Sequence, residues 1–206
     1  MKLFSAFNKK TTENKPIIIV SGLPRSGTSM MMKMVVEGGL QVVTDGIRRA
    51  DDDNPNGYFE LEAVKEMPKG NFAWLKGAGG KVVKVISSLL EYLPPENSYK
   101  IIFMERELSE ILASQQKMLN HRNEANPVED AEMRQQFQNH LAAIKAWLVR
   151  QPNMEVLYVN FNALMADPVP YCELVAGFIG LPMDRERMLS IPNEKLYRNR
   201  AVTENR

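Results

Sequence analysis

The chain has 206 residues, of which 44% are hydrophobic and 25% charged, and its formal net charge is +1. These values are ordinary for one soluble globular domain, and the near-neutral charge argues against a large nucleic-acid-binding surface. A single cysteine excludes an intrachain disulfide and a cysteine cluster for zinc.

The N-terminal residues differ in composition from the rest of the chain. Residues 1–15 are polar and lack the apolar core of a signal peptide, so we expect a flexible lead-in followed by a single domain over residues 16–206. No window approaches the ~18 apolar residues of a membrane span. The simplest expectation is a cytoplasmic protein with no transmembrane segment.

A glycine-containing stretch, GLPRSGTS at residues 22–29, separates two regular elements. The apolar run before it, residues 16–21, predicts a buried strand, and residues 30–37 after it predict a helix. In this arrangement backbone N–H groups bind a phosphate at the N-terminus of a helix. The alternative is an ordinary glycine turn between a strand and a helix.

Further along, strands and helices alternate. Short apolar or β-branched runs predict strands, and amphipathic or capped segments predict helices. The expected strands are 40–43, 81–86, 100–105 and 155–160, and the expected helices are a short one ending near Pro68, then 107–121, 128–150 and 169–179. This alternation predicts an α/β fold, a three-layer sandwich around a central parallel sheet, with ligands at the carboxyl ends of the strands.

The glycine loop lacks one feature of nucleotide-hydrolysing P-loops. Thr28 stands where those enzymes carry a phosphate-binding lysine, and no later expected strand ends in an aspartate for Mg²⁺. The loop instead carries Arg25 and the hydroxyls of Ser26, Thr28 and Ser29. A guanidinium, hydroxyls and backbone amides suit a phosphate or sulfate that has no metal attached.

A second candidate site is Arg106 with Ser114. Arg106 follows an expected strand, and Ser114 lies eight residues on, on the apolar face of the next expected helix. Together they could bind a second anion. The alternative is local: Arg106 pairs with Glu110, and Ser114 bonds the helix carbonyl one turn back.

Together these motifs resemble the sulfotransferases. The stretch at 22–29 resembles their 5′-phosphosulfate loop, and Arg106 and Ser114 match in order and spacing the pair that binds the donor's 3′-phosphate in that family. The fourth-strand segment usually reads Tyr-Glu-Asp-Leu in the family, whereas this chain has Phe-Asn-Ala-Leu at 161–164. The resemblance covers about residues 16–180.

The resemblance implies a P-loop NTPase-like sulfotransferase architecture and a donor, 3′-phosphoadenosine-5′-phosphosulfate. The reaction it implies is in-line transfer of a sulfuryl group, without a metal, to a hydroxyl or amine of a small-molecule or carbohydrate acceptor. Lys84 matches the family's strand-end lysine near the transferred group, although it also suits a solvent-facing edge position. With Arg25 it would stabilise the charge that grows in the transition state. The implied donor-binding residues are Pro24, Arg25, Ser26, Gly27, Thr28, Ser29, Arg106, Ser114 and Phe161, with Phe161 packing on adenine or in the core.

The sequence offers more than one candidate for the base that accepts the acceptor's proton. Cytosolic sulfotransferases carry a histidine two residues after the lysine, where this chain has Ile86. Some carbohydrate sulfotransferases use a glutamate from the segment after the first helix, which favours Glu60, with Glu62 as its rival. Either could equally be a solvated surface residue. We expect His121 and His140 to be surface residues.

The family's glycine-rich C-terminal segment is not evident in this chain. Arg198 and Arg200 could supply its basic contacts to the 3′-phosphate, or could belong to a polar tail. Two other functions remain open: a P-loop kinase or other NTP-dependent transferase, and a non-catalytic nucleotide-binding protein. The sequence identifies neither the acceptor nor the oligomeric state.

Overall fold

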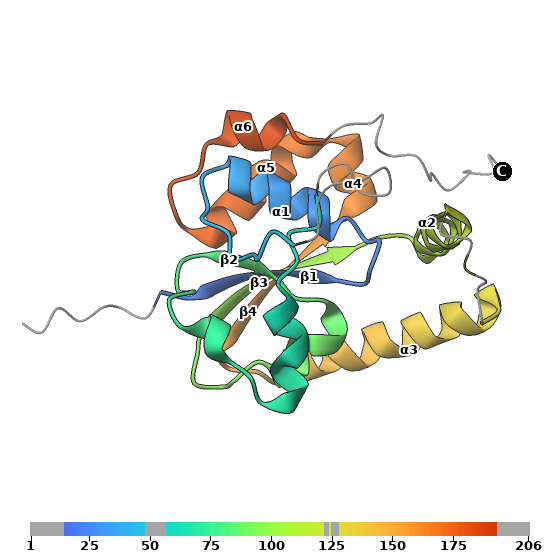
Figure 1. Ribbon diagram of the computed structural model, residues 1–206. Coiled ribbons are helices and arrows are strands. Elements are labelled where there is room, and N and C mark those ends of the chain that lie inside the picture. Colours follow the sequence, from blue (N-terminus) through green and yellow to red (C-terminus); the bar gives the residue numbers. More distant parts are fainter. Residues whose placement is uncertain (1–14, 48–56, 122–123, 125–127, 193–206) are drawn as a thin grey trace, which may run out of the picture.

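The computed structural model describes residues 15–47, 57–121, 124 and 128–192 (Figure 1). Its centre is a parallel four-stranded sheet in the order β2-β1-β3-β4. The strands are β1 (Ile17–Gly22), β2 (Val82–Lys84), β3 (Tyr99–Glu105) and β4 (Met154–Asn160). The predicted α/β fold with a central parallel sheet is therefore confirmed.

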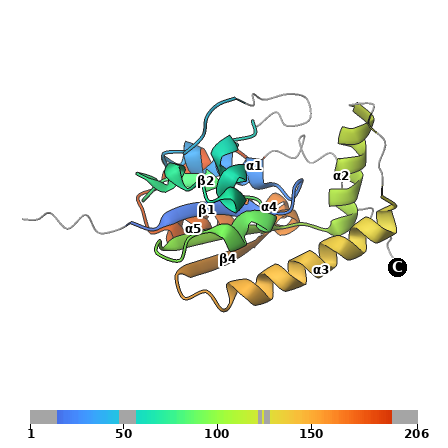
Figure 2. The ribbon, with the colours of Figure 1, turned by 60° about the horizontal axis from the view of Figure 1, so that its bottom comes forward.

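Helices cover both faces of the sheet (Figures 1 and 2). Alternate side chains of β1 enter opposite cores, Ile18 and Val20 on one face and Ile17 and Ile19 on the other, because successive side chains of a strand point to opposite sides. The first face carries α1 (Thr28–Glu37), α4 (Phe161–Ala166), α5 (Pro168–Ile179) and α6 (Arg185–Leu189). The second carries α3 (Asp130–Leu148) and three 3-10 helices, η1 (Glu62–Lys69), η2 (Ala73–Leu75) and η3 (Ser87–Tyr92).

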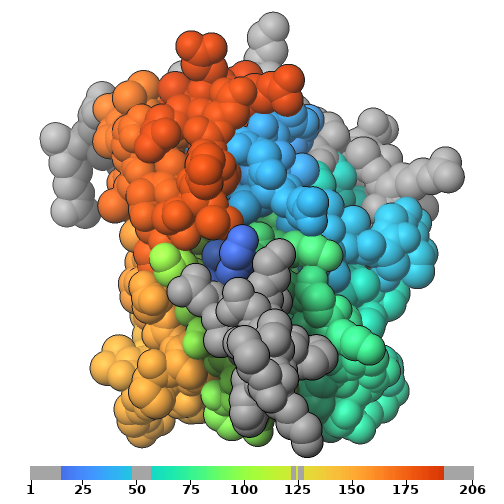
Figure 3. All heavy atoms as spheres, turned by 90° about the vertical axis from the view of Figure 1, so that its left-hand side faces the viewer, coloured from blue at the N-terminus to red at the C-terminus, as the bar shows by residue number. Residues whose placement is uncertain are grey.

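The carboxyl ends and the amino ends of the strands lie beside different parts of the chain. At the carboxyl end, β1 runs into the glycine loop and β3 into α2 (Leu108–His121), which stands beside that edge (Figures 1 and 2). The start of β1 lies on the opposite side of the molecule, between the helices of one layer and the 3-10 segments of the other (Figure 3). Loop residues that follow the strands therefore gather at one edge.

One strand expected from the sequence is nearly absent, and two short helices were not expected. The strand expected at 40–43 is reduced to one isolated bridge between Val42 and Val82. Val43 still donates its backbone N–H to the carbonyl of Val82 at 2.8 Å, and the chain leaves the sheet after it, where Thr44 Oγ1 donates to the carbonyl of Glu60. The short helices α4 and α6 were not predicted, although the side chains of their N-cap residues, Asn160 and Asp184, accept backbone N–H bonds in the usual way.

The expected lead-in and the basic residues of the C-terminal tail lie outside the described residues. In the ranges that are described, no helix is long and apolar enough to cross a membrane.

Candidate functional site

The glycine loop between β1 and α1 depends on two glycines. Gly22 has φ +142°, and a Cβ there would lie 2.6 Å from the carbonyl oxygen of Met104. Gly27 has φ +95°, and its Cβ would lie 2.3 Å from the ring of Phe161. Gly27 makes no side-chain cap at the N-terminus of α1, where the first backbone N–H groups of a helix have no partner within the helix. The two glycines thus let the loop pack closely against Met104 and Phe161.

The hydroxyls of the loop have different surroundings. Ser26 is buried, and its Oγ donates to the carbonyl of Leu23 at 2.7 Å, so it holds the loop in shape. Thr28 is also buried, while Ser29 Oγ accepts a bond from Lys84 Nζ at 3.1 Å. Pro24 is exposed at the turn of the loop.

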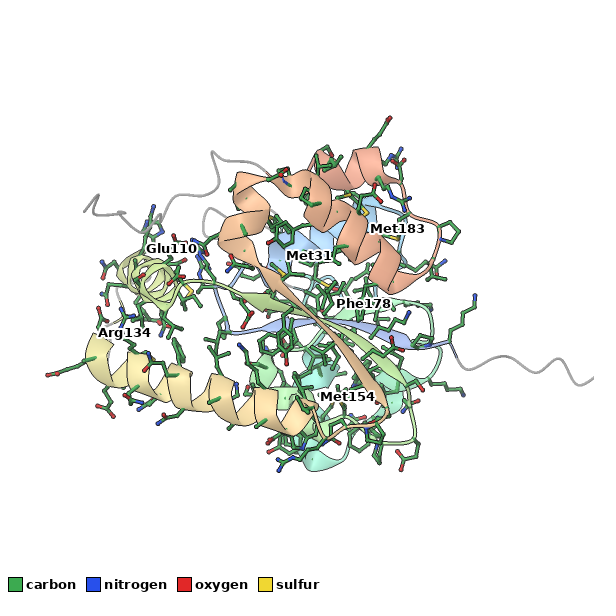
Figure 4. The ribbon with its side chains drawn as sticks, turned by 180° about the vertical axis from the view of Figure 1, so that it is seen from behind. Met31, Glu110, Arg134, Met154, Phe178 and Met183 are labelled. Carbon is green, nitrogen blue, oxygen red and sulfur yellow. The ribbon has the colours of Figure 1, made fainter. Side chains whose placement is uncertain are left out.

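A buried carboxylate holds Arg106 in place. Glu110 is 2% exposed, and its Oε2 accepts a bond of 2.8 Å from Arg106 Nε. Its Oε1 accepts a second bond of 2.9 Å from Asn162 Nδ2. The pairing of Arg106 with Glu110 that the sequence offered as an alternative is therefore present. Figure 4 shows Glu110 on α2, beside the carboxyl edge of the sheet.

The same arginine also reaches the glycine loop. Arg106 Nη1 donates to the carbonyl of Arg25 at 3.0 Å, and its guanidinium lies 4.5 Å from the ring centroid of Phe161. Phe161 is 6% exposed and also packs against Gly27. Arg106 therefore has two neighbours that orient it and one backbone partner in the loop.

Ser114 meets the glycine loop directly. Arg25 Nε donates to Ser114 Oγ at 2.9 Å, across 89 residues of sequence, a contact that the local alternative does not include. Arg25 takes this position with φ +70°, a left-handed conformation that is uncommon outside glycine. The two candidate anion sites predicted from the sequence are thus brought together by Arg25.

Lys84 and Glu60 lie on the other side of the loop. Lys84 Nζ donates to the carbonyl of Tyr58 at 3.1 Å as well as to Ser29. Glu60 follows two residues later; its side chain is 25% exposed and its Oε2 lies 4.0 Å from Lys65 Nζ, whereas the side chain of Glu62 is 51% exposed and pairs with the same lysine at 2.7 Å. Of the two carboxylates, Glu60 is the more enclosed.

One polar pair was missed from the sequence. His140, expected at the surface, is half-buried, and its Nε2 lies 2.8 Å from the Oγ of Ser87, which is 1% exposed. The two residues are 53 positions apart, so no local pattern could have joined them. Within the described ranges, no group of three or more His, Cys, Asp or Glu side chains could hold a metal ion.

Comparisons with known proteins identify a single family. The family model described as the sulfotransferase domain matches residues 15–199. The chain is similar in structure to mouse sulfotransferase SULT7A1 complexed with PAP, with a TM-score of 0.55 and 15% identity over 93% of this chain and 68% of that one. It is also similar to the sulfotransferase domain from the Synechococcus PCC 7002 olefin synthase, with a TM-score of 0.52 and 14% identity over 90% and 80% of the two chains. No curated protein sequence matches significantly.

Proposed function

Because the chain belongs to the sulfotransferase domain family, we propose that it transfers a sulfuryl group from 3′-phosphoadenosine-5′-phosphosulfate to a hydroxyl or amine of a small-molecule or carbohydrate acceptor. The observation that carries this proposal is the bond between Arg25 and Ser114, which joins the glycine loop to helix α2, the helix that follows β3. A donor with two separated phosphates needs two such anion sites side by side. Transfer by in-line displacement, without a metal ion, and a cytoplasmic location belong to the same proposal.

The residues present fit such a donor. Gly22 and Gly27 lack the Cβ atoms that would collide with their surroundings, so the backbone can keep the shape of an anion cradle. Arg106 is oriented by a buried carboxylate and an aromatic ring before any ligand arrives. The residues proposed to hold the donor are Pro24, Arg25, Ser26, Gly27, Thr28 and Ser29 at the 5′ side, Arg106 and Ser114 at the 3′ side, and Phe161 beneath Arg106.

The donor supplies an activated sulfuryl group, and the protein's own residues handle charge and protons. Arg25 within the loop and Lys84 beside it carry positive charge and would stabilise the negative charge that develops on the leaving phosphate. Glu60 would accept the proton of the acceptor at its carboxylate. Arg198 and Arg200 are proposed as further contacts to the 3′-phosphate.

A thermal-shift experiment tests the donor site. Adenosine 3′,5′-bisphosphate at about 100-fold over its Kd should raise the unfolding midpoint by about 5–10 °C without Mg²⁺, because a ligand that binds only the folded state stabilises it. A response to ATP with Mg²⁺ alone would support the kinase alternative and overturn the proposal. Tight binding of the bisphosphate without transfer to any acceptor would support the non-catalytic alternative.

Glu60→Gln tests the proposed base. In a screen of alcohols, phenols, sugars and amines with labelled donor, the variant should transfer about 10²- to 10⁴-fold more slowly than the wild type, because a positioned base contributes that much. Its affinity for the bisphosphate should not change, and Glu62→Gln serves as the matched control. Retained turnover in Glu60→Gln would assign the role to another residue.

A further inference from the structure

The Tyr58–Glu62 arm, the segment that leads from the acceptor side of the site into η1, is held by side chains from other parts of the chain. Thr44 Oγ1 donates to the carbonyl of Glu60 at 2.8 Å. Asp45 Oδ2 accepts from the backbone N–H of Glu62 at 2.7 Å. This bond is the main reason that the pKa of Asp45 lies below its ordinary value. These two bonds fix the far end of the arm.

The near end of the arm, at Tyr58, is contacted by Lys84. Its ammonium donates at 3.1 Å both to the carbonyl of Tyr58 and to the Oγ of Ser29. Ser29 is the second residue of α1, within the loop proposed to bind the 5′-phosphate. One side chain therefore joins the phosphate loop to the Tyr58–Glu62 arm.

The backbone of the arm is strained between these attachments. Phe59 has φ +50°, and among the described residues it shares a positive φ outside glycine only with Arg25 of the phosphate loop. The left-handed conformation is unfavourable for a bulky side chain, so it persists only while the surrounding bonds impose it. Loosening the Lys84 bond would let Phe59 relax and would redirect Glu60, its neighbour in the chain.

We propose that Lys84 couples occupancy of the phosphate loop to the placement of Glu60, through its bond to the carbonyl of Tyr58. An ammonium binds a phosphate oxygen more strongly than a neutral hydroxyl. Its three N–H donors allow Lys84 to turn from Ser29 to a bound anion while it keeps Tyr58. Lys84 is in this respect a positioning residue for Glu60. The inference rests on the proposed function, since it takes the phosphate loop to be the donor site.

Hydrogen exchange of the full chain tests the coupling. With saturating adenosine 3′,5′-bisphosphate, the amides of the Tyr58–Glu62 arm should exchange at least about 5-fold more slowly than without ligand, because fewer local openings occur. Lys84→Met should still bind the bisphosphate through the loop amides and Arg106, but its arm should show no ligand-dependent slowing. Lys81→Met, at the amino end of β2, is the matched control and should behave as the wild type.

A second variant tests the coupling if Lys84→Met is poorly folded. Thr44→Val removes the bond to Glu60 without touching the phosphate loop, so exchange in the arm should be faster while the slowing by ligand remains. Full slowing in Lys84→Met, or loss of slowing in Thr44→Val, would overturn the coupling. Bisphosphate binding to the wild type without any slowing would also overturn it and leave the donor site intact. Absence of binding would overturn the donor site and the coupling together.

Discussion

Arg106→Ala is expected to lower the free energy of unfolding by about 3–5 kcal/mol, because it leaves the buried carboxylate of Glu110 without its charged partner. The same change should weaken binding of adenosine 3′,5′-bisphosphate by roughly 10- to 100-fold, the value of one or two charge-assisted hydrogen bonds. Binding of adenosine 5′-monophosphate, which has no 3′-phosphate, should change little. Denaturant unfolding and titration calorimetry measure the two effects.

The double variant Arg106→Ala, Glu110→Gln separates the structural effect from the binding effect. A neutral amide at position 110 removes the uncompensated charge and still accepts the bond from Asn162, so most of the lost stability should return. Affinity for the bisphosphate should stay low, since the guanidinium is still absent. Equal weakening of the bisphosphate and the monophosphate in Arg106→Ala would show that Arg106 acts only in the structure.

Gly27→Ala is expected to be the most destabilising change within the glycine loop. The new Cβ would lie 2.3 Å from the ring of Phe161, and the residue would have to keep φ +95°. Left-handed strain and the clash together should cost about 2–5 kcal/mol of unfolding free energy. Bisphosphate binding should be lost as the loop moves away from Phe161.

Gly39→Ala is the matched control for this change. Gly39 has φ +109°, similar to Gly27, but its Cβ would meet nothing within 4 Å, so only the backbone strain of about 1–2 kcal/mol applies. In a Phe161→Ala background, the further cost of Gly27→Ala should fall to that of Gly39→Ala. If the two alanine variants are equally destabilised in the wild-type background, the contact with Phe161 has no energetic role.

The sequence predicted the elements whose signal is local. β3 and α3 were expected at 100–105 and 128–150 and are found at Tyr99–Glu105 and Asp130–Leu148, because an apolar run and a helical stripe each bury their own side chains. The strand predicted at 40–43 was wrong because its β-branched residues are typical of a strand. Only Val42 bridges β2, since the chain beyond Val43 is held by bonds to residues near position 60.

The candidate site was predictable to the same extent. The glycine spacing and the spacing of Arg106 and Ser114 lie within single segments, and they indicated two anion sites. The partners of these residues depend on the folded chain: Ser114 meets Arg25, and Glu110 bonds Asn162 from 52 residues away. No local pattern encodes such contacts, so the way in which the two sites join required the structure.

The central place of β1 in the sheet has a consequence for how the protein is made. β1 is synthesised first, yet both strands that flank it come much later, from Val82 and Tyr99 onward. During translation Ile17–Gly22 therefore has two unpaired edges until these strands are made, and unpaired strand edges favour association of a chain that is not yet folded. The glycine loop is complete early, but it acquires its shape only when the ribosome has released β3 and the chain beyond it.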